Sequence, residues 1–278
     1  MTRLKAGDRV AGIPLIPCGR CAACGRGEFS LCAHYSFIGS RRQGSFAEYV
    51  AAPEANAFPI GGVSYEQGAL FEPAAVALHG LLRGGYRGGG RVAILGGGTI
   101  GLFTLQWARA YGAGRVDVFD IAPARLALAR DLGSDAVFNT AGPAFEEEAQ
   151  RVAEAGGYDY VYETAGSTET IRLALRMAGN RGRVCLIGTP ARDPAFTARE
   201  WELINRKELC ISGSWMGYSA PFPGREWELT AAFFADGRLR VHPDMLHGVL
   251  PLSRIDEAFQ LYRTPGAVKG KILIDSEA

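Results

Sequence analysis

The sequence has no long apolar run and almost no net charge. None of its apolar stretches reaches the roughly 18 residues that a membrane-spanning helix needs, and its formal net charge is +1. A near-neutral chain gives no electrostatic reason to expect binding to nucleic acid or to an acidic membrane face. Residues 1–20 also lack the apolar stretch and the small-residue cleavage site of a secretory signal. We therefore expect a cytoplasmic protein.

The rest of the composition is that of an ordinary globular protein. Hydrophobic residues make up 47% of the chain and charged residues 21%, which excludes a disordered or fibrous protein. At roughly 150 residues per domain, the 278 residues suggest two domains. Only four histidines are present, so few imidazoles are available for a metal site.

Four of the six cysteines cluster at the start of the chain. Cys18, Cys21, Cys24 and Cys32 have the spacing C-x2-C-x2-C-x7-C. In a reducing compartment such a cluster binds metal more often than it forms disulfides. Four thiolates complete a tetrahedral shell around zinc, so the predicted site is structural. An iron–sulfur cluster and disulfides are the weaker alternatives. We expect Cys185 and Cys210, which stand alone in apolar runs, to be buried core thiols.

The hydrophobic pattern changes along the chain. Up to about residue 72, short apolar runs predict strands at 10–16, 46–52 and 56–60. From about residue 91, strands and helices alternate, which predicts an α/β fold with a doubly wound parallel sheet. The tail predicts helices over 224–237 and 253–263, the second with Ser253 as its N-cap, and a last strand at 268–274.

A glycine loop follows the first strand of the alternating region and begins a helix. It contains Gly96-x-Gly98-x-x-Gly101, and Asp120 ends the next strand. This arrangement is typical of dinucleotide binding, and the carboxylate favours NAD over NADP because it would repel a 2′-phosphate. The alternative is that Asp120 only caps the following helix. The cofactor-binding candidates from this region are Gly96, Gly98, Thr99, Ile100, Gly101, Asp120 and Arg125.

Taken together, the cysteine run, the Glu72-Pro73 step, the glycine loop and the alternating second half resemble the zinc-dependent medium-chain dehydrogenases. The segments 37–50 and 213–228 are similar to the sugar-alcohol branch of that family. The resemblance implies a Rossmann domain over residues 77–216. It also implies a partial GroES-like β-barrel substrate domain over residues 1–76 and 217–278.

The same resemblance implies an oxidoreductase that uses zinc and NAD to oxidise a polyol phosphate to a ketose phosphate. Three further cofactor-binding positions are implied at the ends of later strands, namely Thr164, Ala165 and Gly188. Arg41 and Arg42 are candidates for binding the substrate phosphate, although two arginines on a glycine-flanked loop also suit an ordinary solvated turn. Pairing of last strands, here residues 208–215, implies a homo-oligomer.

One expected part of the family pattern is missing from the sequence. Glu72 matches the family's glutamate ligand of the catalytic zinc, but the early segments that carry the cysteine and histidine ligands are absent. We expect a chain that lacks the usual N-terminal segment, and with it the catalytic zinc, since such an ion needs about three protein ligands. The other candidate functions are a sorbitol- or threonine-dehydrogenase-like enzyme and a non-catalytic remnant that binds NAD and zinc.

Overall fold

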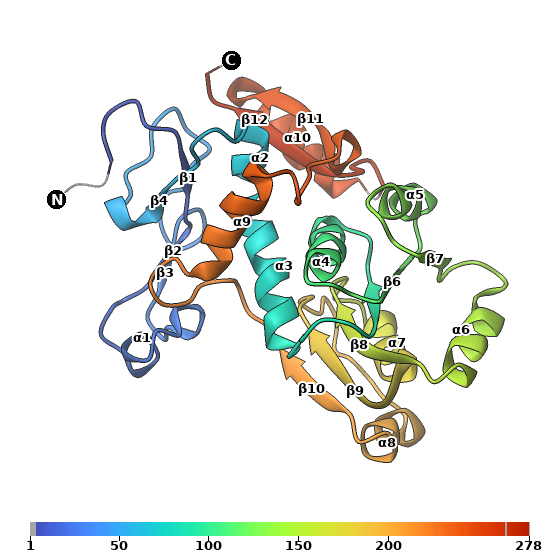
Figure 1. The fold of residues 1–278 in the computed structure, drawn as a ribbon. Coiled ribbons are helices and arrows are strands. Elements are labelled where there is room, and N and C mark those ends of the chain that lie inside the picture. Colours follow the sequence, from blue (N-terminus) through green and yellow to red (C-terminus); the bar gives the residue numbers. More distant parts are fainter. Residues whose placement is uncertain (1–3, 265, 278) are drawn as a thin grey trace. The chain divides into compact units, whose positions relative to one another are not determined.

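The structure is a computed structural model that describes residues 4–264 and 266–277. The chain forms two compact units (Figure 1). The first unit contains Met1–Ala75 and Met216–Ala278, and the second contains Val76–Trp215. Helix α3 (Phe71–Arg83) begins in the first unit and ends in the second.

The second unit is built on a six-stranded parallel sheet. Its strand order is β10 (Cys210–Gly213), β9 (Ala178–Leu186), β8 (Tyr158–Glu163), β5 (Arg91–Leu95), β6 (Arg115–Asp120) and β7 (Ala136–Asn139). The chain starts in the middle at β5, moves outward to β7, then crosses back to β8. The predicted doubly wound α/β fold is therefore confirmed, and the strand order reverses between β5 and β8 while all six strands stay parallel.

Helices cover this sheet because its central strands are apolar on both faces. In β5, Val92 and Ile94 point to one face while Ala93 and Leu95 point to the other, and all four are fully buried. Helix α4 (Thr99–Ala110) contacts β5 and β6, and α5 (Pro123–Asp131) contacts β6 and β7. Helices α6 (Phe145–Glu154), α7 (Thr168–Met177) and α8 (Ala198–Arg206) complete the unit.

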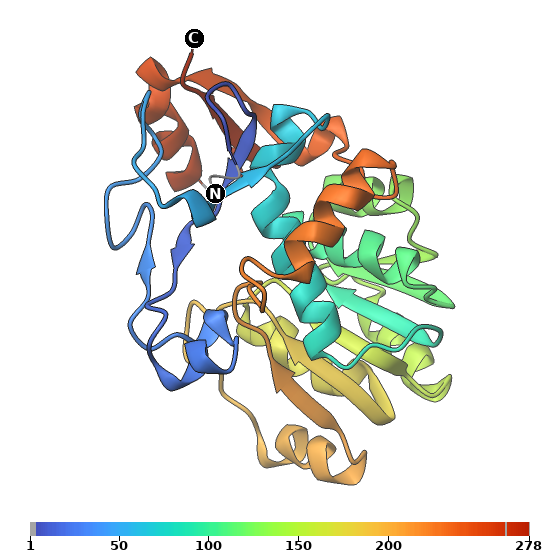
Figure 2. The same ribbon diagram turned by 60° about the vertical axis from the view of Figure 1, so that its left-hand side comes forward.

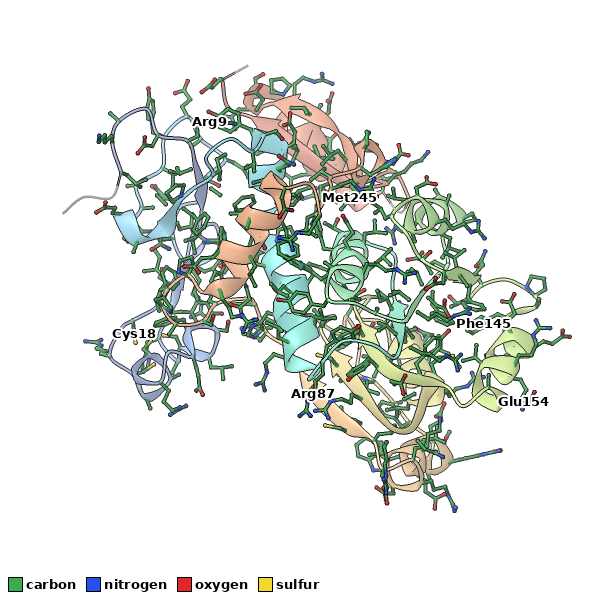
Figure 3. All side chains as sticks on the ribbon, in the orientation of Figure 1. Arg9, Cys18, Arg87, Phe145, Glu154 and Met245 are labelled. Carbon is green, nitrogen blue, oxygen red and sulfur yellow. The ribbon has the colours of Figure 1, made fainter. Side chains whose placement is uncertain are left out.

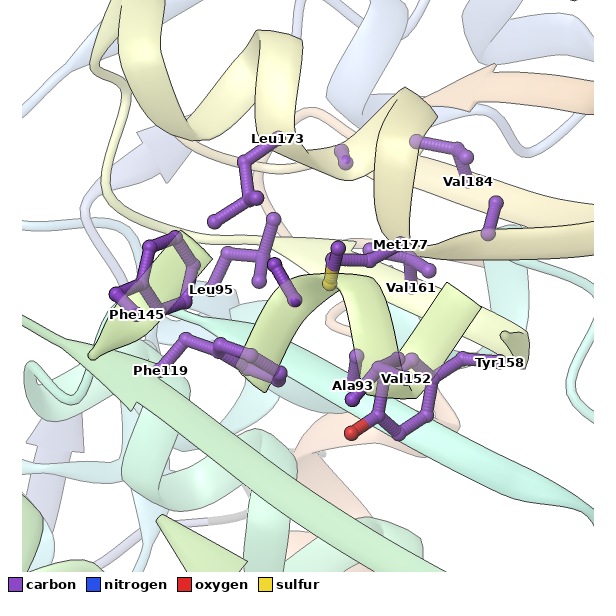
Figure 4. Close-up of a cluster of buried hydrophobic side chains, with 13 residues drawn as sticks. Ala93, Leu95, Phe119, Phe145, Val152, Tyr158, Val161, Leu173, Met177 and Val184 are labelled. Carbon is purple, nitrogen blue, oxygen red and sulfur yellow. The ribbon is translucent and has the colours of Figure 1, made fainter. Parts of the chain in front are cut away.

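A hydrophobic cluster fills the face of the sheet that α6 and α7 cover (Figure 4). The helices supply Phe145, Val152 and Leu173, and these side chains pack against Leu95 and Phe119 of the strands. Phe119 also stacks on Phe138, with ring centroids 4.7 Å apart. The strand ends that follow these residues are thus fixed by a close-packed core.

The described residues of the first unit form three small sheets. Strand β1 (Val10–Gly12) pairs antiparallel with β4 (Ala57–Pro59), and β2 (Leu15–Ile16) pairs antiparallel with β3 (Ser36–Phe37). Strand β11 (Leu246–Pro251) pairs parallel with β12 (Lys271–Asp275). The helices of this unit are α1 (Ala22–Gly25), α2 (Tyr65–Ala69), α9 (Arg225–Ala235) and α10 (Ile255–Arg263).

An aromatic cluster joins the two separate stretches of chain that make up the first unit. Phe71 stacks on Phe234 at 5.5 Å between ring centroids, and Trp227 lies 5.8 Å from Phe58 and 6.1 Å from Tyr218. The residues near 58 and 71 come from before the second unit in sequence, and those at 218–234 come from after it. Burial of large rings is the main apolar contribution that holds these stretches together.

Three local predictions were wrong. Residues 46–52 form no strand, and Tyr49 is 91% exposed, because no partner strand lies beside them among the described residues. Helix α10 begins at Ile255 after a 3-10 turn over Leu252–Arg254, so Ser253 is not its N-cap. Cys210 is exposed because β10 is the edge strand of the sheet (Figure 2).

None of the helices within the described part of the chain is long and apolar enough to cross a membrane.

Candidate functional site

The glycine loop forms a tight turn between β5 and α4. Gly96 has a φ of +109°, a left-handed backbone conformation that favours glycine. A side chain at Gly101 would overlap the carbonyl oxygen of Gly96, so the helix packs directly against the turn. Gly98 is the N-cap of α4 and offers no capping side chain, and a methyl group at Gly98 would meet only open space. Unpaired N–H groups at a helix start favour a phosphate, and the open space beside Gly98 leaves the start of α4 accessible.

Asp120 connects this turn to the end of the neighbouring strand β6. Its Oδ2 atom accepts a hydrogen bond from the N–H of Gly97 at 2.7 Å, and its Oδ1 atom accepts one from the N–H of Ala122 at 2.8 Å. Arg125 lies with Nη1 3.7 Å from Oδ2. The carboxylate thus bonds the N–H of Ala122, but Ala122 is the N-cap of α5 and no described side chain caps that helix, so Asp120 does not act as its cap. Each carboxylate oxygen can accept a further hydrogen bond, so both keep acceptor capacity for a ribose hydroxyl.

Strand β8 ends beside the same glycine turn. The hydroxyl of Thr164 donates to the carbonyl oxygens of Leu95 and Gly96, each at 3.1 Å. A methyl group at Gly96 would lie 2.8 Å from the hydroxyl oxygen of Thr164 and 3.1 Å from the Cβ atom of Ala165. The structure therefore brings Gly96, Thr164 and Ala165 together, although they lie almost 70 positions apart in sequence.

Sequence reasoning missed Glu163, which precedes Thr164. Its side chain is fully buried, and its Oε1 atom accepts hydrogen bonds from the N–H groups of Ala165 and Gly166 at 2.9 and 2.8 Å. Burial raises the pKa of this carboxyl, and the hydrogen bonds from Thr170, Gly166 and Ala165 oppose that rise. The available signal was a carboxylate at the end of a strand, directly after Val161 and Tyr162, where an unpaired charge would be costly.

The four clustered cysteines of the first unit lie close together at α1, and Figure 3 labels Cys18 among them. Their sulfur atoms are all within 4.8 Å of one another; Sγ of Cys18 is 4.0 Å from that of Cys24, and Sγ of Cys21 is 3.9 Å from that of Cys32. Four sulfurs about 2.3 Å from a central zinc would be about 3.8 Å apart in a tetrahedron. The cluster fits a structural zinc site.

The electrostatics of the cluster also suit a metal bound by thiolates. The backbone N–H groups of Cys24 and Ala33 lower the pKa of Cys21 to about 6. Burial raises the pKa of Cys24 to about 12, so this thiol needs a cation beside it to lose its proton. Because zinc binds thiolates, binding would release protons and would weaken at low pH.

Ser30 ties the cysteine loop to the later stretch of the first unit. Its hydroxyl donates to the carbonyl oxygen of Tyr218 at 3.3 Å and accepts from the N–H of Tyr218 at 3.0 Å. The Tyr218 ring is buried and stacks on Trp227. The loop is therefore fixed to the aromatic core on one side and can be closed by an ion on the other.

Two family patterns match the chain. That of the zinc-binding dehydrogenases covers residues 99–233, and that of the alcohol dehydrogenase GroES-like domain covers residues 1–62. Galactitol 1-phosphate 5-dehydrogenase of Escherichia coli (strain K12) is 39% identical over 245 residues, which are 88% of this chain and 71% of that protein. The chain belongs to the zinc-binding dehydrogenase family.

Solved structures of zinc-binding dehydrogenases support the same assignment. The structure of galactitol-1-phosphate dehydrogenase from Escherichia coli matches with a TM-score of 0.92 and 36% identity, over 99% of this chain and 80% of that one. A zinc-binding dehydrogenase from Sinorhizobium meliloti 1021, solved with NADP, matches with a TM-score of 0.83 and 33% identity, over 99% and 78%. L-threonine 3-dehydrogenase of Chromobacterium violaceum is 31% identical, over 98% and 76%. The predicted family and enzyme class are therefore confirmed.

The described residues do not complete a second metal site of the zinc-binding dehydrogenase kind. Glu72 is partly buried on α3, and burial raises its pKa while Lys271 opposes that rise. Among residues 4–264 and 266–277, the four cysteines are the one set of three or more His, Cys, Asp or Glu side chains close enough to share an ion. Glu72 alone does not meet the roughly three-ligand requirement of a catalytic zinc.

Arg41 and Arg42 are both exposed in the first unit. The guanidinium carbon of Arg41 lies 3.8 Å from the centre of the Tyr35 ring, and Nη1 donates to the carbonyl oxygen of Tyr35 at 2.9 Å. This contact fixes the side chain of Arg41 and leaves part of its guanidinium edge able to bind an anion. Their assignment to substrate phosphate stays a prediction.

Proposed function

We propose that this chain oxidises a polyol phosphate with NAD, as galactitol 1-phosphate 5-dehydrogenase does. The substrate would be galactitol 1-phosphate and the product tagatose 6-phosphate. The identity of 39% over 88% of the chain is the observation that carries this proposal. It is supported by a second unit whose glycine turn and Asp120 have the geometry of a dinucleotide site.

In this proposal, residues 77–216 are the NAD-binding domain, and residues 1–76 and 217–278 are the substrate domain. The start of α4 approaches the pyrophosphate through the glycine turn, which consists of Gly96, Gly98, Thr99, Ile100 and Gly101. Asp120 accepts from the hydroxyls of the adenosine ribose, with Arg125 beside it, and Thr164, Ala165 and Gly188 line the cofactor's other half. Bound NAD would supply the hydride acceptor for conversion of a secondary alcohol to a ketone, with one proton released.

The cysteine cluster would hold zinc for stability, because four thiolates leave no open coordination position for substrate. Glu72 does not complete a catalytic zinc site among the described residues, and we derive no step through such an ion. A complete structural zinc site without a complete catalytic one favours a second candidate function: the chain would bind NAD and zinc without turnover.

Arg41 and Arg42 would bind the phosphate of the substrate. Replacement of both arginines by alanine should then raise KM for the phosphorylated substrate and leave NAD affinity unchanged. If the two arginines only form a solvated turn, the double substitution should change neither KM nor NAD affinity.

The deciding experiment combines NAD binding with turnover. Calorimetry should show NAD binding, and absorbance of NADH should rise with galactitol 1-phosphate but not with galactitol. NAD binding and about one zinc per chain without turnover would favour the non-catalytic candidate. Equal rates with sorbitol or L-threonine would identify another substrate in the same family, and no NAD binding would overturn the proposal.

The edge of the sheet supports a homo-oligomer. Strand β10 is an edge strand, and Ile211 on it is 40% exposed. An exposed edge presents unpaired N–H and C=O groups that favour pairing with another strand. Light scattering should show a dimer or tetramer, and the substitution Ile211→Lys should shift the oligomeric state towards monomer.

A further inference from the structure

Glu163 is the last residue of β8, and its side chain is fully buried in the second unit. Three donors share its Oε1 atom: the N–H groups of Ala165 and Gly166, and the hydroxyl of Thr170 at 2.8 Å. Its Oε2 atom has no hydrogen-bond partner among the described residues. A buried carboxyl with one unpartnered oxygen is costly, which points to a role beyond packing.

The backbone of Glu163 also connects the ends of two strands. Its carbonyl oxygen accepts from the N–H groups of Ile187 at 2.8 Å and Gly188 at 3.0 Å, just after β9. A methyl group at Gly188 would lie 2.7 Å from the Cα atom of Gly166 and 2.8 Å from Oε2 of Glu163. The turn after β8 and the turn after β9 are therefore packed backbone against backbone, with the Glu163 carboxyl between them.

The position of these turns follows from the sheet order. Asp120 marks the end of β6, on one side of the central strand β5, and the start of α4 follows β5 itself. A dinucleotide lies across the carboxyl ends of the strands at the point where their order reverses. If its adenosine half is beside Asp120, its nicotinamide half extends over the ends of β8 and β9.

We propose that Glu163 is a positioning residue for the nicotinamide half of the cofactor, because its buried carboxyl holds Ala165, Gly166 and Gly188 in the conformation that this half contacts. The inference rests on the proposed NAD binding. It concerns one end of the cofactor only, since the contacts of Glu163 do not reach the Gly97–Asp120 pair.

The test compares two probes of different length on three substitutions. NADH and AMP are titrated against the wild type, Glu163→Asp, Glu163→Gln and Glu200→Asp. Aspartate shortens the side chain and withdraws the acceptor, whereas glutamine keeps a carbonyl oxygen where Oε1 stands. Glu200 is the matched control, because it accepts from the N–H of its own N-cap residue, Thr197, at 2.8 Å and caps α8 in the same unit.

We expect Glu163→Asp to weaken NADH binding about tenfold, the size of effect of one lost hydrogen bond to a charged group. AMP affinity should stay within about twofold of wild type, because the adenosine end is untouched. Glu163→Gln should restore most of the NADH affinity, and Glu200→Asp should change neither. Amide hydrogen exchange at 165 and 166 should speed up in Glu163→Asp and not in Glu163→Gln.

Unchanged NADH affinity in Glu163→Asp would overturn the inference, and so would an equal loss of NADH and AMP affinity. A glutamine variant as weak as the aspartate variant would also count against it. If the wild type binds neither probe, the proposed function fails and this inference fails with it. If the wild type binds both probes and Glu163→Asp binds NADH equally well, only this inference fails. Thermal unfolding of each variant separates loss of binding from loss of fold.

Discussion

The Cα atom of Gly101 faces the carbonyl oxygen of Gly96 so closely that a side chain at 101 would overlap it. This contact fixes the first turn of α4 against the end of β5. Gly98, three positions earlier, has open space where a side chain would stand and an extended φ of −76°. In the proposed function, the two glycines of the motif therefore have different roles: Gly101 allows close packing, and Gly98 leaves space for the pyrophosphate.

Substitutions at these glycines should separate the two roles. Gly101→Ala should lower the free energy of unfolding by about 3 kcal/mol, because rigid backbone blocks the added methyl group. Gly98→Ala should unfold like the wild type but bind NAD weakly, since its methyl group would occupy the space of the pyrophosphate. Thermal unfolding and calorimetry with NAD measure the two effects, and a Gly101→Ala variant as stable as wild type would contradict the packing argument.

Removal of a zinc ligand should destabilise the first unit. Cys24→Ser should reduce the zinc content from about one ion per chain to near zero, because a structural site needs four ligands. Small zinc modules draw on the order of 10 kcal/mol of folding energy from their metal, so the first unit should unfold at a lower temperature or become open to proteolysis.

The matched control for this substitution is Cys210→Ser, an exposed cysteine outside the cluster. Metal analysis should find its zinc content unchanged. Full zinc content in Cys24→Ser would argue against the four-cysteine site.

The choice between NAD and NADP should depend on Asp120. Asp120→Ser should weaken NAD binding by about tenfold to a hundredfold, the effect of losing hydrogen bonds to a charged acceptor, and should improve NADP binding by removing a repulsive charge. The control is Asp131→Ser at the exposed end of α5. If the wild type binds NADP more tightly than NAD in titration, Asp120 does not set a preference for NAD.

Acid should remove a contribution that Glu200 makes to stability. The N–H of Thr197 and the guanidinium of Arg172 lower the pKa of Glu200 from 4.5 to about 2. A carboxyl with a lowered folded-state pKa stabilises the fold above its unfolded pKa, and this contribution is lost as the pH falls through the folded one. The second unit should therefore lose this stabilisation between about pH 4.5 and pH 2.

Melting temperatures of the wild type and Glu200→Gln should differ at pH 6 and converge near pH 2. Glu147→Gln, on the exposed face of α6, serves as the control for a general loss of charge. A gap between wild type and Glu200→Gln that persists at pH 2 would show that protonation of Glu200 is not its cause.

The sequence by itself determined the features that depend on neighbours in the chain. The cysteine spacing predicted a cluster that the structure brings within metal-binding distance, and the alternation of strands and helices after residue 91 predicted the parallel sheet. These features follow from local geometry, because a short glycine-rich loop or a strand–turn–helix unit is specified by residues only a few positions apart.

Only the tertiary structure decided the features that depend on distant partners. The role of Glu163 depends on Gly188 and Thr170, the aromatic core depends on Phe58 and Trp227, and the exposure of Cys210 depends on its strand lying at the edge. An apolar run such as 46–52 predicts a strand whether or not a partner is beside it. Pairing and burial are properties of residues brought together by folding, so the local pattern cannot report them.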